Sequence, residues 1–357
     1  MSLLAACGDD DSAEPAPTDT TTGASTDVEP IATAPTTAEA SDDTTSASTQ
    51  PTPDESTTPT TPRTKTAPDP TTTEAGADFP RTVVDAGGPV EIPARPERII
   101  ATGAQVDLDS LVVLGIDPVG AGTFFGAPPP WVADAVDDAV LFDVNETNLE
   151  QVASLDPDLV LGPADVLEPV ADELRQIAPT LLLDTATPWR QNLELIADAT
   201  GREDDADEFL DDFDLLVEEM RAAAAPFAET TISAITVGPD GSVLALAARS
   251  ATGEALELLG VPRADGQDAD VEFVPVAEEL LGDLDADVIF VWHSAFLAPQ
   301  WEELQASPVW QSIPAVADGR VVVSTDERWF FATPQAVRLS VEALISDVLE
   351  PGTGRGG

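Results

Sequence analysis

Several residue types that support catalysis are nearly absent from this sequence. Its 357 residues include no tyrosine, one cysteine and one histidine. One cysteine cannot form an internal disulfide, and a cysteine and a histidine far apart in the chain cannot supply a zinc or manganese site. No Gly-x-Ser-x-Gly motif is present, and His293 beside Ser294 shows no triad arrangement. We therefore expect no enzymatic activity and no metal site formed by the protein itself.

Basic residues and long apolar runs are scarce as well. The chain has 15 lysines and arginines against 67 acidic residues, which gives a formal net charge of −52. Such a charge repels nucleic acid, so we expect no nucleic-acid partner, and we interpret the acidic excess as a solvation adaptation to salt. No apolar run approaches the roughly 18 residues that a membrane span needs. Any membrane attachment would therefore have to be a lipid.

The only cysteine, Cys7, follows Leu-Leu-Ala-Ala and precedes Gly-Asp-Asp-Asp. This stretch resembles the lipobox of bacterial lipoproteins, in which a signal peptidase cuts before a cysteine that is then lipidated. Residues 1–6 are then expected to be the remnant of a signal peptide. Residues 7–79 are rich in Thr, Pro, Ser and Asp and are predicted to form a disordered tether. A chance cysteine followed by a glycosylated stalk remains the alternative.

From residue 80 onward, short β-rich runs alternate with helical patterns. Strands are predicted at 98–102, 118–122, 158–161, 180–184, 232–237, 243–246, 287–291 and 321–324. Helices are predicted at 107–114, 149–154, 167–177, 253–259, 276–281, 301–305 and 334–349. Strand–helix–strand order with short connections indicates mainly parallel sheets flanked by helices.

A longer helix separates the two halves of this pattern. Between residues 203 and 225 apolar residues recur at spacings of three and four, which predicts one helix roughly 30 Å long. The fold class is therefore α/β, with two lobes, one connecting helix and a ligand cleft between the lobes. The predicted boundaries are 80–200 for the N-terminal lobe, 201–226 for the connecting helix, 227–351 for the C-terminal lobe and 352–357 for a disordered tail.

Three segments resemble the ferric-siderophore substrate-binding proteins of ABC importers. They are PERIIATGAQVDLDSLVVLGIDPVGAG (96–122), NLEQVASLDPDLVLG (148–162) and SPVWQSIPAVADGRVVVST (307–325). The resemblance extends over residues 81–349. It implies an extracytoplasmic, lipid-anchored monomer that captures a ferric siderophore and delivers it to a permease with its ATPase subunit. A glutamate on each lobe docks on the permease in this family. The matching residues here are Glu150 and, less directly, Glu278, for which Glu279 is an alternative.

Candidate ligand-binding residues follow from where strands end. In open parallel sheets, ligands bind beyond the carboxyl ends of the strands. The segments there are rich in aromatic residues and also hold three arginines, which suits a bulky ligand bearing oxygen anions. The candidates are Phe124, Phe125, Trp131, Trp189, Arg190, Arg249, Trp292, His293, Arg328 and Trp329. A structural alternative stays open for several of them: Trp189 and Arg190 could open a helix, Arg249 and Arg328 could balance acids, and His293 could be a buried structural histidine.

Other functions fit parts of the pattern. Cobalamin needs only a large aromatic cleft and is the alternative cargo, whereas haem is disfavoured because tyrosine is absent and histidine is single. An extracellular hydrolase and a cell-surface structural module are further alternatives. The three arginines favour an anionic ferric complex, although the chelator class cannot be deduced from the sequence. Iron would enter only as part of the ligand, so no cofactor is expected.

Overall fold

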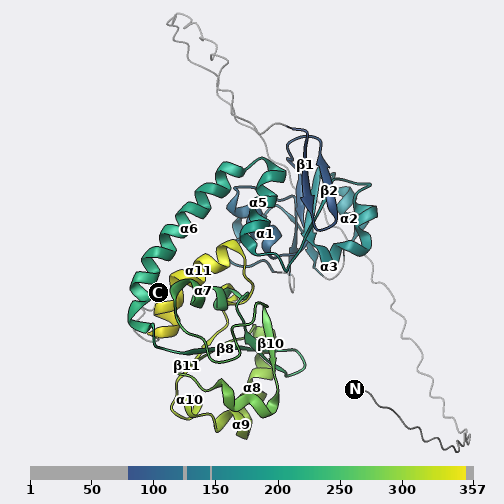
Figure 1. The fold of residues 1–357 in the computed structure, drawn as a ribbon. Coiled ribbons are helices and arrows are strands. Elements are labelled where there is room, and N and C mark those ends of the chain that lie inside the picture. The colour runs from purple at the N-terminus through teal and green to yellow at the C-terminus, as the bar shows by residue number, and fades with distance from the viewer. Residues whose placement is uncertain (1–78, 124–126, 145–146, 351–357) are drawn as a thin grey trace, which may run out of the picture. The chain divides into compact units, whose positions relative to one another are not determined.

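A computed structural model describes residues 79–123, 127–144 and 147–350. These residues belong to one compact unit that spans 71–357. The unit contains two lobes, each built on a β-sheet, and helix α6 (Glu203–Ala224) runs from one lobe to the other (Figure 1). The predicted fold class is confirmed. Within the described part of the chain, no helix is long and apolar enough to cross a membrane.

The first lobe is built on a five-stranded parallel sheet. In sheet order its strands are β5 (Val140–Asp143), β4 (Gly120–Thr123), β3 (Ile99–Ala101), β6 (Leu159–Pro163) and β7 (Thr180–Leu183). Strands β3, β4, β6 and β7 are buried along their whole length, as expected for a sheet covered on both faces. The flanking helices are α1 (Val106–Val113), α2 (Leu149–Ser154), α3 (Ala164–Leu167), α4 (Ala171–Leu174) and α5 (Trp189–Thr200), with 3-10 turns at Ala133–Val136 and Glu168–Val170.

A β-hairpin that was not predicted packs on the edge of this sheet. It consists of β1 (Arg81–Asp85) and β2 (Gly88–Ile92). The carboxylate of Asp85 accepts a hydrogen bond from the backbone N–H of Leu182 at 2.7 Å, and Ala86 N–H donates to the carbonyl of Leu182 at 3.1 Å. These bonds attach the hairpin to β7, so the first lobe begins with an antiparallel element.

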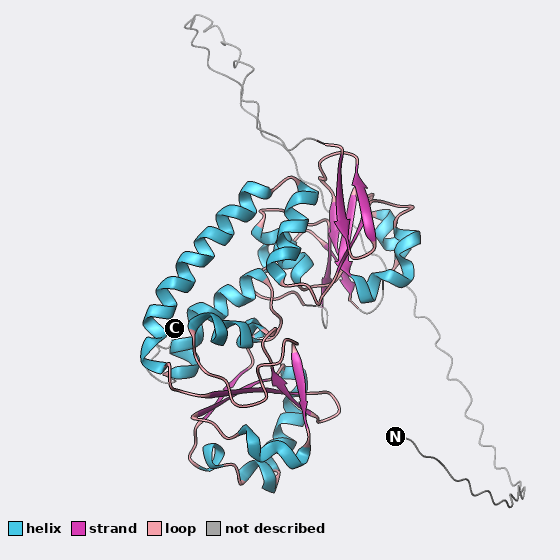
Figure 2. Ribbon diagram, viewed as in Figure 1, coloured by secondary structure: helices cyan, strands magenta, loops and turns pink. Residues whose placement is uncertain are grey.

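The second lobe is built on a mixed five-stranded sheet (Figure 2). In sheet order its strands are β10 (Phe273–Val276), β9 (Val243–Leu246), β8 (Ile232–Val237), β11 (Val288–Trp292) and β12 (Val321–Ser324). The strands β8, β11 and β12 are parallel, whereas β9 and β10 are antiparallel to their neighbours. The helices are α7 (Ala251–Leu259), α8 (Ala298–Ala306), α9 (Pro308–Gln311), α10 (Pro314–Ala317) and α11 (Pro334–Leu344), which continues as a π-helical turn at Ile345–Leu349. Four 3-10 segments complete this half: Ala225–Phe227, Glu278–Leu284, Ala295–Leu297 and Glu327–Trp329.

Helix α6 is part of a core that both lobes share. Its Phe213 is fully buried and meets the ring of Trp189 on α5 edge-to-face, with 5.5 Å between centroids. Further along, α6 packs against α7 and α11 of the second lobe. One continuous apolar cluster joins α1, α5, α6, α7 and α11. The two lobes are thus held by packed side chains as well as by the covalent connection.

Two predicted helices differ from the structure. The span 167–177 is broken into α3, a 3-10 turn and α4, because Pro169 lacks the N–H that a continuous helix needs. The span 276–281 instead contains the end of β10 and the start of the 3-10 segment Glu278–Leu284. The extended pairing of β10 with β9 overrides the helical pattern there.

Candidate functional site: a cavity between the lobes

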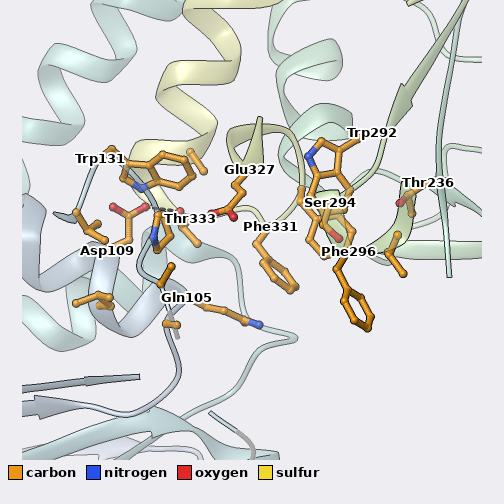
Figure 3. Close-up of a pocket in the computed structure, with 18 of the residues that line it drawn as sticks. Gln105, Asp109, Trp131, Thr236, Trp292, Ser294, Phe296, Glu327, Phe331 and Thr333 are labelled. Carbon is orange, nitrogen blue, oxygen red and sulfur yellow. Dashed lines mark hydrogen bonds between the residues drawn. The ribbon is translucent and has the colours of Figure 1, made fainter. Parts of the chain in front are cut away.

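A cavity of about 310 Å³, called cavity 1 here, is lined by residues of both lobes. Its first-lobe wall follows β3 and β4, and its second-lobe wall follows β8, β11 and β12, so it lies at the carboxyl ends of the parallel strands. Figure 3 shows side chains from both walls directed toward the cavity. The labelled residues are Gln105, Asp109, Trp131, Thr236, Trp292, Ser294, Phe296, Glu327, Phe331 and Thr333.

The loop between β3 and α1 is fixed by a buried carboxylate. Asp107 accepts hydrogen bonds from the backbone N–H groups of Gly103 at 2.5 Å and Gln105 at 3.0 Å. Between them Ala104 has a φ of 54°, a left-handed conformation that costs a residue with a Cβ roughly 1–2 kcal/mol. Burial raises the pKa of Asp107, and the backbone N–H bonds partly offset this. Asp107 thereby holds Ala104 and Gln105 in the cavity wall.

Asp109 connects the two lobes at the inner end of cavity 1. Its Oδ2 accepts hydrogen bonds from the Thr333 hydroxyl and from the backbone N–H of Gln335, the latter at 3.0 Å. Burial raises the pKa of Asp109 to about 6, although these hydrogen bonds favour the ionised form. The bonds tie α1 to the start of α11, so one carboxylate both lines the cavity and fixes the relation of its two walls.

Three polar atoms in the wall of cavity 1 have no hydrogen-bond partner within the described residues. They are Asp109 Oδ1, Trp131 Nε1 and Thr236 Oγ1, all buried. The Trp131 side chain lowers the pKa of Asp109, but Trp131 Nε1 and Asp109 Oδ1 do not meet the geometry of a hydrogen bond. A buried polar atom without a partner costs about 1–3 kcal/mol. A ligand offering oxygen and N–H groups would satisfy these atoms.

Aromatic rings form the second-lobe wall. Trp292 stacks on Phe330 with 4.0 Å between ring centroids, and its Nε1 donates to the carbonyl of Asp326 at 2.7 Å. Phe331 meets Phe330 edge-to-face at 4.5 Å. Phe296 is 64% exposed and lines the cavity near the carboxyl end of β11. The wall offers a flat apolar surface to a bulky ligand.

A second cavity of about 620 Å³, called cavity 2, adjoins the first and shares Gln105, Phe331 and Thr333 with it. Two interlobe hydrogen bonds border it: Trp189 Nε1 donates to Glu254 Oε1 at 2.8 Å, and the Arg249 guanidinium donates to the carbonyl of Ala186. Four acids line cavity 2, Glu254, Glu257, Asp270 and Glu272.

Burial raises the pKa of two of these acids. The pKa of Glu272 rises to about 7, an effect that the charge of Arg249 partly offsets. The pKa of Glu254 is raised in the same direction, with the Trp189 hydrogen bond opposing the shift. Cavity 2 thus holds four acids and Arg249, whereas cavity 1 is mainly apolar and includes five aromatic residues.

Four of the predicted ligand residues line one of these cavities. Trp131 and Trp292 line cavity 1, and Trp189 and Arg249 line cavity 2. Phe124 and Phe125 lie outside the described residues. A direct ligand contact by any of the four stays a prediction.

Trp329 and Arg328 differ from their predicted place in the cleft wall. Trp329 is 1% exposed and packs edge-to-face on Phe290, with 5.1 Å between centroids. Arg328 pairs with the carboxylate of Asp326 two residues away. The tight turn at Glu327–Trp329 accounts for both placements, since it directs Trp329 into the core and leaves Glu327 on the cavity wall.

Arg190 and His293 line neither cavity, and a ligand contact by either stays a prediction. The Arg190 guanidinium lies 4.8 Å from the ring centroid of Phe213 and bonds to Asp214 at 2.6 Å, so it joins α5 to α6. His293 is 7% exposed and stacks on Trp301 at 6.1 Å. The contacts of His293 match the structural alternative noted for it above, and Arg190 lies near the start of α5, as its alternative predicts.

Sequence reasoning missed Asp109, Thr236, Phe296 and Glu327. Thr236 and Phe296 lie near the carboxyl ends of β8 and β11, so the strand-end rule could have found them. Asp109 carried a weaker signal, an acid within the apolar helix α1. Glu327 carried none among so many acids. The described residues contain no group of three or more His, Cys, Asp and Glu side chains that could hold a metal ion.

The raised pKa of Asp109 predicts a change in stability with pH. A folded-state pKa of about 6 against an ordinary 3.8 means that the native state binds this proton more tightly than the unfolded chain does. As the pH rises from about 4 to about 6, ionisation of Asp109 should lower the free energy of unfolding by roughly 2–3 kcal/mol. We expect the wild type to lose this much relative to Asp109→Asn between pH 4 and pH 7, measured by urea unfolding.

Other acids titrate equally in both proteins, so the difference isolates Asp109. Asp204→Asn, on the exposed side of α6, serves as the control and should follow the wild type at every pH. If the free energy of unfolding of Asp109→Asn changed with pH in parallel with that of the wild type, the raised pKa of Asp109 would be contradicted.

A protein-family model described as "Periplasmic binding protein" matches residues 100–327 of this chain. The probable siderophore-binding lipoprotein YfiY of Bacillus subtilis is 30% identical over 278 residues, which cover 72% of this chain and 84% of that protein. The Fe(3+)-citrate-binding protein YfmC of Bacillus subtilis is 25% identical over 257 residues, which cover 70% and 79%.

A solved structure shows the same fold. The triscatecholate siderophore-binding protein FeuA from Bacillus subtilis, crystallised with ferri-bacillibactin, matches with a TM-score of 0.66 at 20% identity. The match covers 77% of this chain and 100% of FeuA. The family model alone covers more than half of the chain. This chain therefore belongs to the periplasmic binding protein family and is an extracytoplasmic binding protein rather than an enzyme.

Proposed function

We propose that this protein captures a ferric siderophore between its lobes and delivers it to the permease of an ABC importer. The observation that carries the proposal is cavity 1, an aromatic cavity with unpartnered polar atoms at the carboxyl ends of both sheets. Identity of 30% to a probable siderophore-binding lipoprotein supports the same cargo. A chelated iron ion has its coordination filled by the siderophore, so the protein needs to recognise only the outer surface of the chelate.

Replacing aromatic residues of the cavity 1 wall should weaken cargo binding. Phe296→Ala removes a ring that is 64% exposed and so leaves the core intact, and Trp131→Ala removes a ring from the opposite lobe. Losing one large contact surface costs on the order of 1–3 kcal/mol, a fall in affinity of roughly tenfold or more. Quenching of tryptophan fluorescence by a panel of ferric siderophores and cobalamin measures this.

The matched control is Leu215→Ala, because Leu215 is 65% exposed on α6 and lines neither cavity. It should leave affinity unchanged. Saturable binding of cobalamin with no response to any ferric siderophore would overturn the proposed cargo. Unchanged affinity in both cavity variants would place the binding site elsewhere.

Docking on the permease is proposed to use Glu150 on the first lobe and Glu278 on the second. Both residues are exposed. Glu150 lies in the first turn of α2, where a carboxylate also suits the helix dipole. However, the side chain of Asn148 already caps α2 by accepting from Gln151 N–H at 3.0 Å. The helix therefore does not need Glu150 as its cap, and the carboxylate is available to meet arginines of a partner.

Charge reversal separates docking from a role in helix stability. Glu150→Arg and Glu278→Arg should each leave siderophore affinity intact but reduce uptake by cells that depend on this protein, and the double variant should abolish it. A purely structural role predicts a stability loss under about 1 kcal/mol with normal uptake. Glu303→Arg, at an exposed position on α8, controls for the change in net charge. Full uptake by the double variant would refute docking through these residues.

Anchoring is proposed to occur through a lipid on Cys7, which lies outside the described residues. The support is the Leu-Leu-Ala-Ala-Cys stretch and the similarity to a relative named as a lipoprotein. When the gene is expressed behind a complete signal sequence, the protein should incorporate labelled fatty acid and partition into detergent. Cys7→Ala should be released in soluble form, and a membrane-bound alanine variant would rule out this anchor.

A further inference from the structure

Two buried atoms in the wall of cavity 1 complement each other but form no hydrogen bond. Trp131 Nε1 is a donor and Asp109 Oδ1 is an acceptor, and neither atom has a partner within the described residues. Figure 3 shows the indole nitrogen directed toward the Asp109 carboxylate, and the Trp131 side chain is close enough to lower the pKa of Asp109. A small rotation of the indole would therefore satisfy both atoms at once.

The other oxygen of Asp109 already has two donors. Oδ2 accepts from the hydroxyl of Thr333 and from the backbone N–H of Gln335, the latter at 3.0 Å. The side chain is only 3% exposed, so these contacts replace water. When the carboxyl group is protonated, its proton sits on Oδ1, because a proton on Oδ2 would face the N–H of Gln335. The acid proton and the Trp131 N–H therefore compete for one atom.

The protonation state of Asp109 then decides how the indole of Trp131 is held. An ionised Oδ1 accepts from Trp131 Nε1 in a charge-assisted hydrogen bond, which is stronger than a bond between neutral groups. A protonated Oδ1 carries a donor hydrogen of its own, so two donors would face each other and the indole is displaced. Burial raises the pKa of Asp109 to about 6, so the two arrangements exchange between about pH 5 and pH 7.

Other charged groups around Asp109 are engaged elsewhere. Helix α1 packs against α5, α6 and α11. Their charged side chains are paired, exposed or both: Arg190, Glu194 and Asp198 on α5, Arg338 and Glu342 on α11, and Arg221 and the acids on α6. On α1 itself, Asp107 is bound to the backbone of the β3 loop. The other carboxylate among the described residues of the cavity 1 wall is Glu327, which is exposed.

We infer that Asp109 is a positioning residue for cargo binding: its ionised Oδ1 holds the indole of Trp131 in the cavity wall, and a proton on that oxygen releases the indole. When cargo packs on the held indole, the O–H bond at Oδ1 breaks, the proton passes to solvent, and the hydrogen bond from Trp131 Nε1 forms. Cargo binding and proton release therefore favour each other. The inference rests on the proposed function, in which Trp131 contacts the cargo.

A first experiment follows the indole N–H of Trp131 by NMR and requires no cargo. In proton–nitrogen spectra of protein labelled on tryptophan, Trp131→Phe identifies the signal by its loss. In wild type this signal should move between pH 5 and pH 7.5, with a midpoint near pH 6, as the hydrogen bond forms. In Asp109→Asn it should stay still, because the amide oxygen accepts from Gln335 and the amide nitrogen, a donor, takes the place of Oδ1.

Three further variants assign the titration to Asp109. Thr333→Val keeps the carboxylate but removes a hydrogen bond that favours its ionised form, so the midpoint should rise. Glu327→Gln removes the other carboxylate of the cavity wall, and Glu303→Gln removes an exposed acid on α8 that lines neither cavity. Both should keep the wild-type midpoint. A signal that is still in wild type, moves equally in Asp109→Asn, stops moving in Glu327→Gln or keeps its midpoint in Thr333→Val overturns the inference.

A second experiment measures cargo binding by tryptophan fluorescence at pH 5 and pH 7.5. The probes are the ferric complexes of a cyclic trihydroxamate, of citrate and of a triscatecholate. For a chelate that binds, the loss of affinity on going to pH 5 should be roughly tenfold larger in wild type than in Asp109→Asn, whose side chain does not titrate. Calorimetry at pH 5.5 in buffers of different ionisation enthalpy should show wild type releasing roughly half a proton more than Asp109→Asn.

The outcomes separate this inference from the proposed function. Equal pH dependence of affinity in wild type and Asp109→Asn overturns the link between cargo binding and the proton, while siderophore binding stands. Failure of all three ferric chelates to bind wild type at pH 7.5 contradicts the proposed function. In that case the NMR titration, which uses no chelate, still decides whether Asp109 holds the indole of Trp131.

Discussion

The continuous apolar core that crosses from one lobe to the other is the constraint on which the rest of the structure depends. Helices α1 and α5 of the first lobe, α7 and α11 of the second, and α6 between them bury side chains in one cluster. Closely packed interiors resist gradual deformation, so large separation of the lobes would expose apolar surface. The cavity walls therefore keep a nearly fixed distance, and a rigid, bulky ligand matches such a site better than one that requires wide closure.

Hydrogen bonds between the lobes add to the constraint that the apolar core places on their relative position. The Asp109 carboxylate binds Thr333 and Gln335, Trp189 binds Glu254, and Arg249 binds the carbonyl of Ala186, so three hydrogen-bonded links border the two cavities. The Asp109 link buries a charged group, which is costly unless its hydrogen bonds are nearly complete. At Asp109, where the lobes meet, burial raises the pKa to about 6, although the hydrogen bonds that it accepts act to lower the pKa.

The fold was largely predictable because it follows from periodicity. The stripe on α6 and the buried runs of β6 and β8 are local patterns that the structure keeps. The hairpin β1–β2 was missed although its pairing is local, with Asp85 opposite Gly88. Only its attachment to β7 depends on a distant contact, the bond between Asp85 and Leu182, 97 residues apart in sequence. The position of the cavities at the strand ends was predictable, whereas the identity of the residues that line them was less so. Trp292 and Trp131 came from the strand-end rule, whereas the direction of Trp329 is set by the tight turn at Glu327–Trp329, which residue type does not reveal.

The arginines explain why charge was the hardest feature to infer. The chain has 67 acids and 15 bases, and arginines of the described residues such as Arg190, Arg249 and Arg328 bond to an acid or a carbonyl, a pairing that competes with ligand binding. Arg190 forms an ion pair with Asp214, which joins α5 to α6. Arg328 forms an ion pair with Asp326, in the turn before Trp329. Both charges are therefore neutralised by neighbouring residues. Counting cations near a predicted cleft thus overstates the positive charge inside it. The charged residues of the described chain that line cavity 1 are Asp109 and Glu327, in a wall that is otherwise mainly apolar.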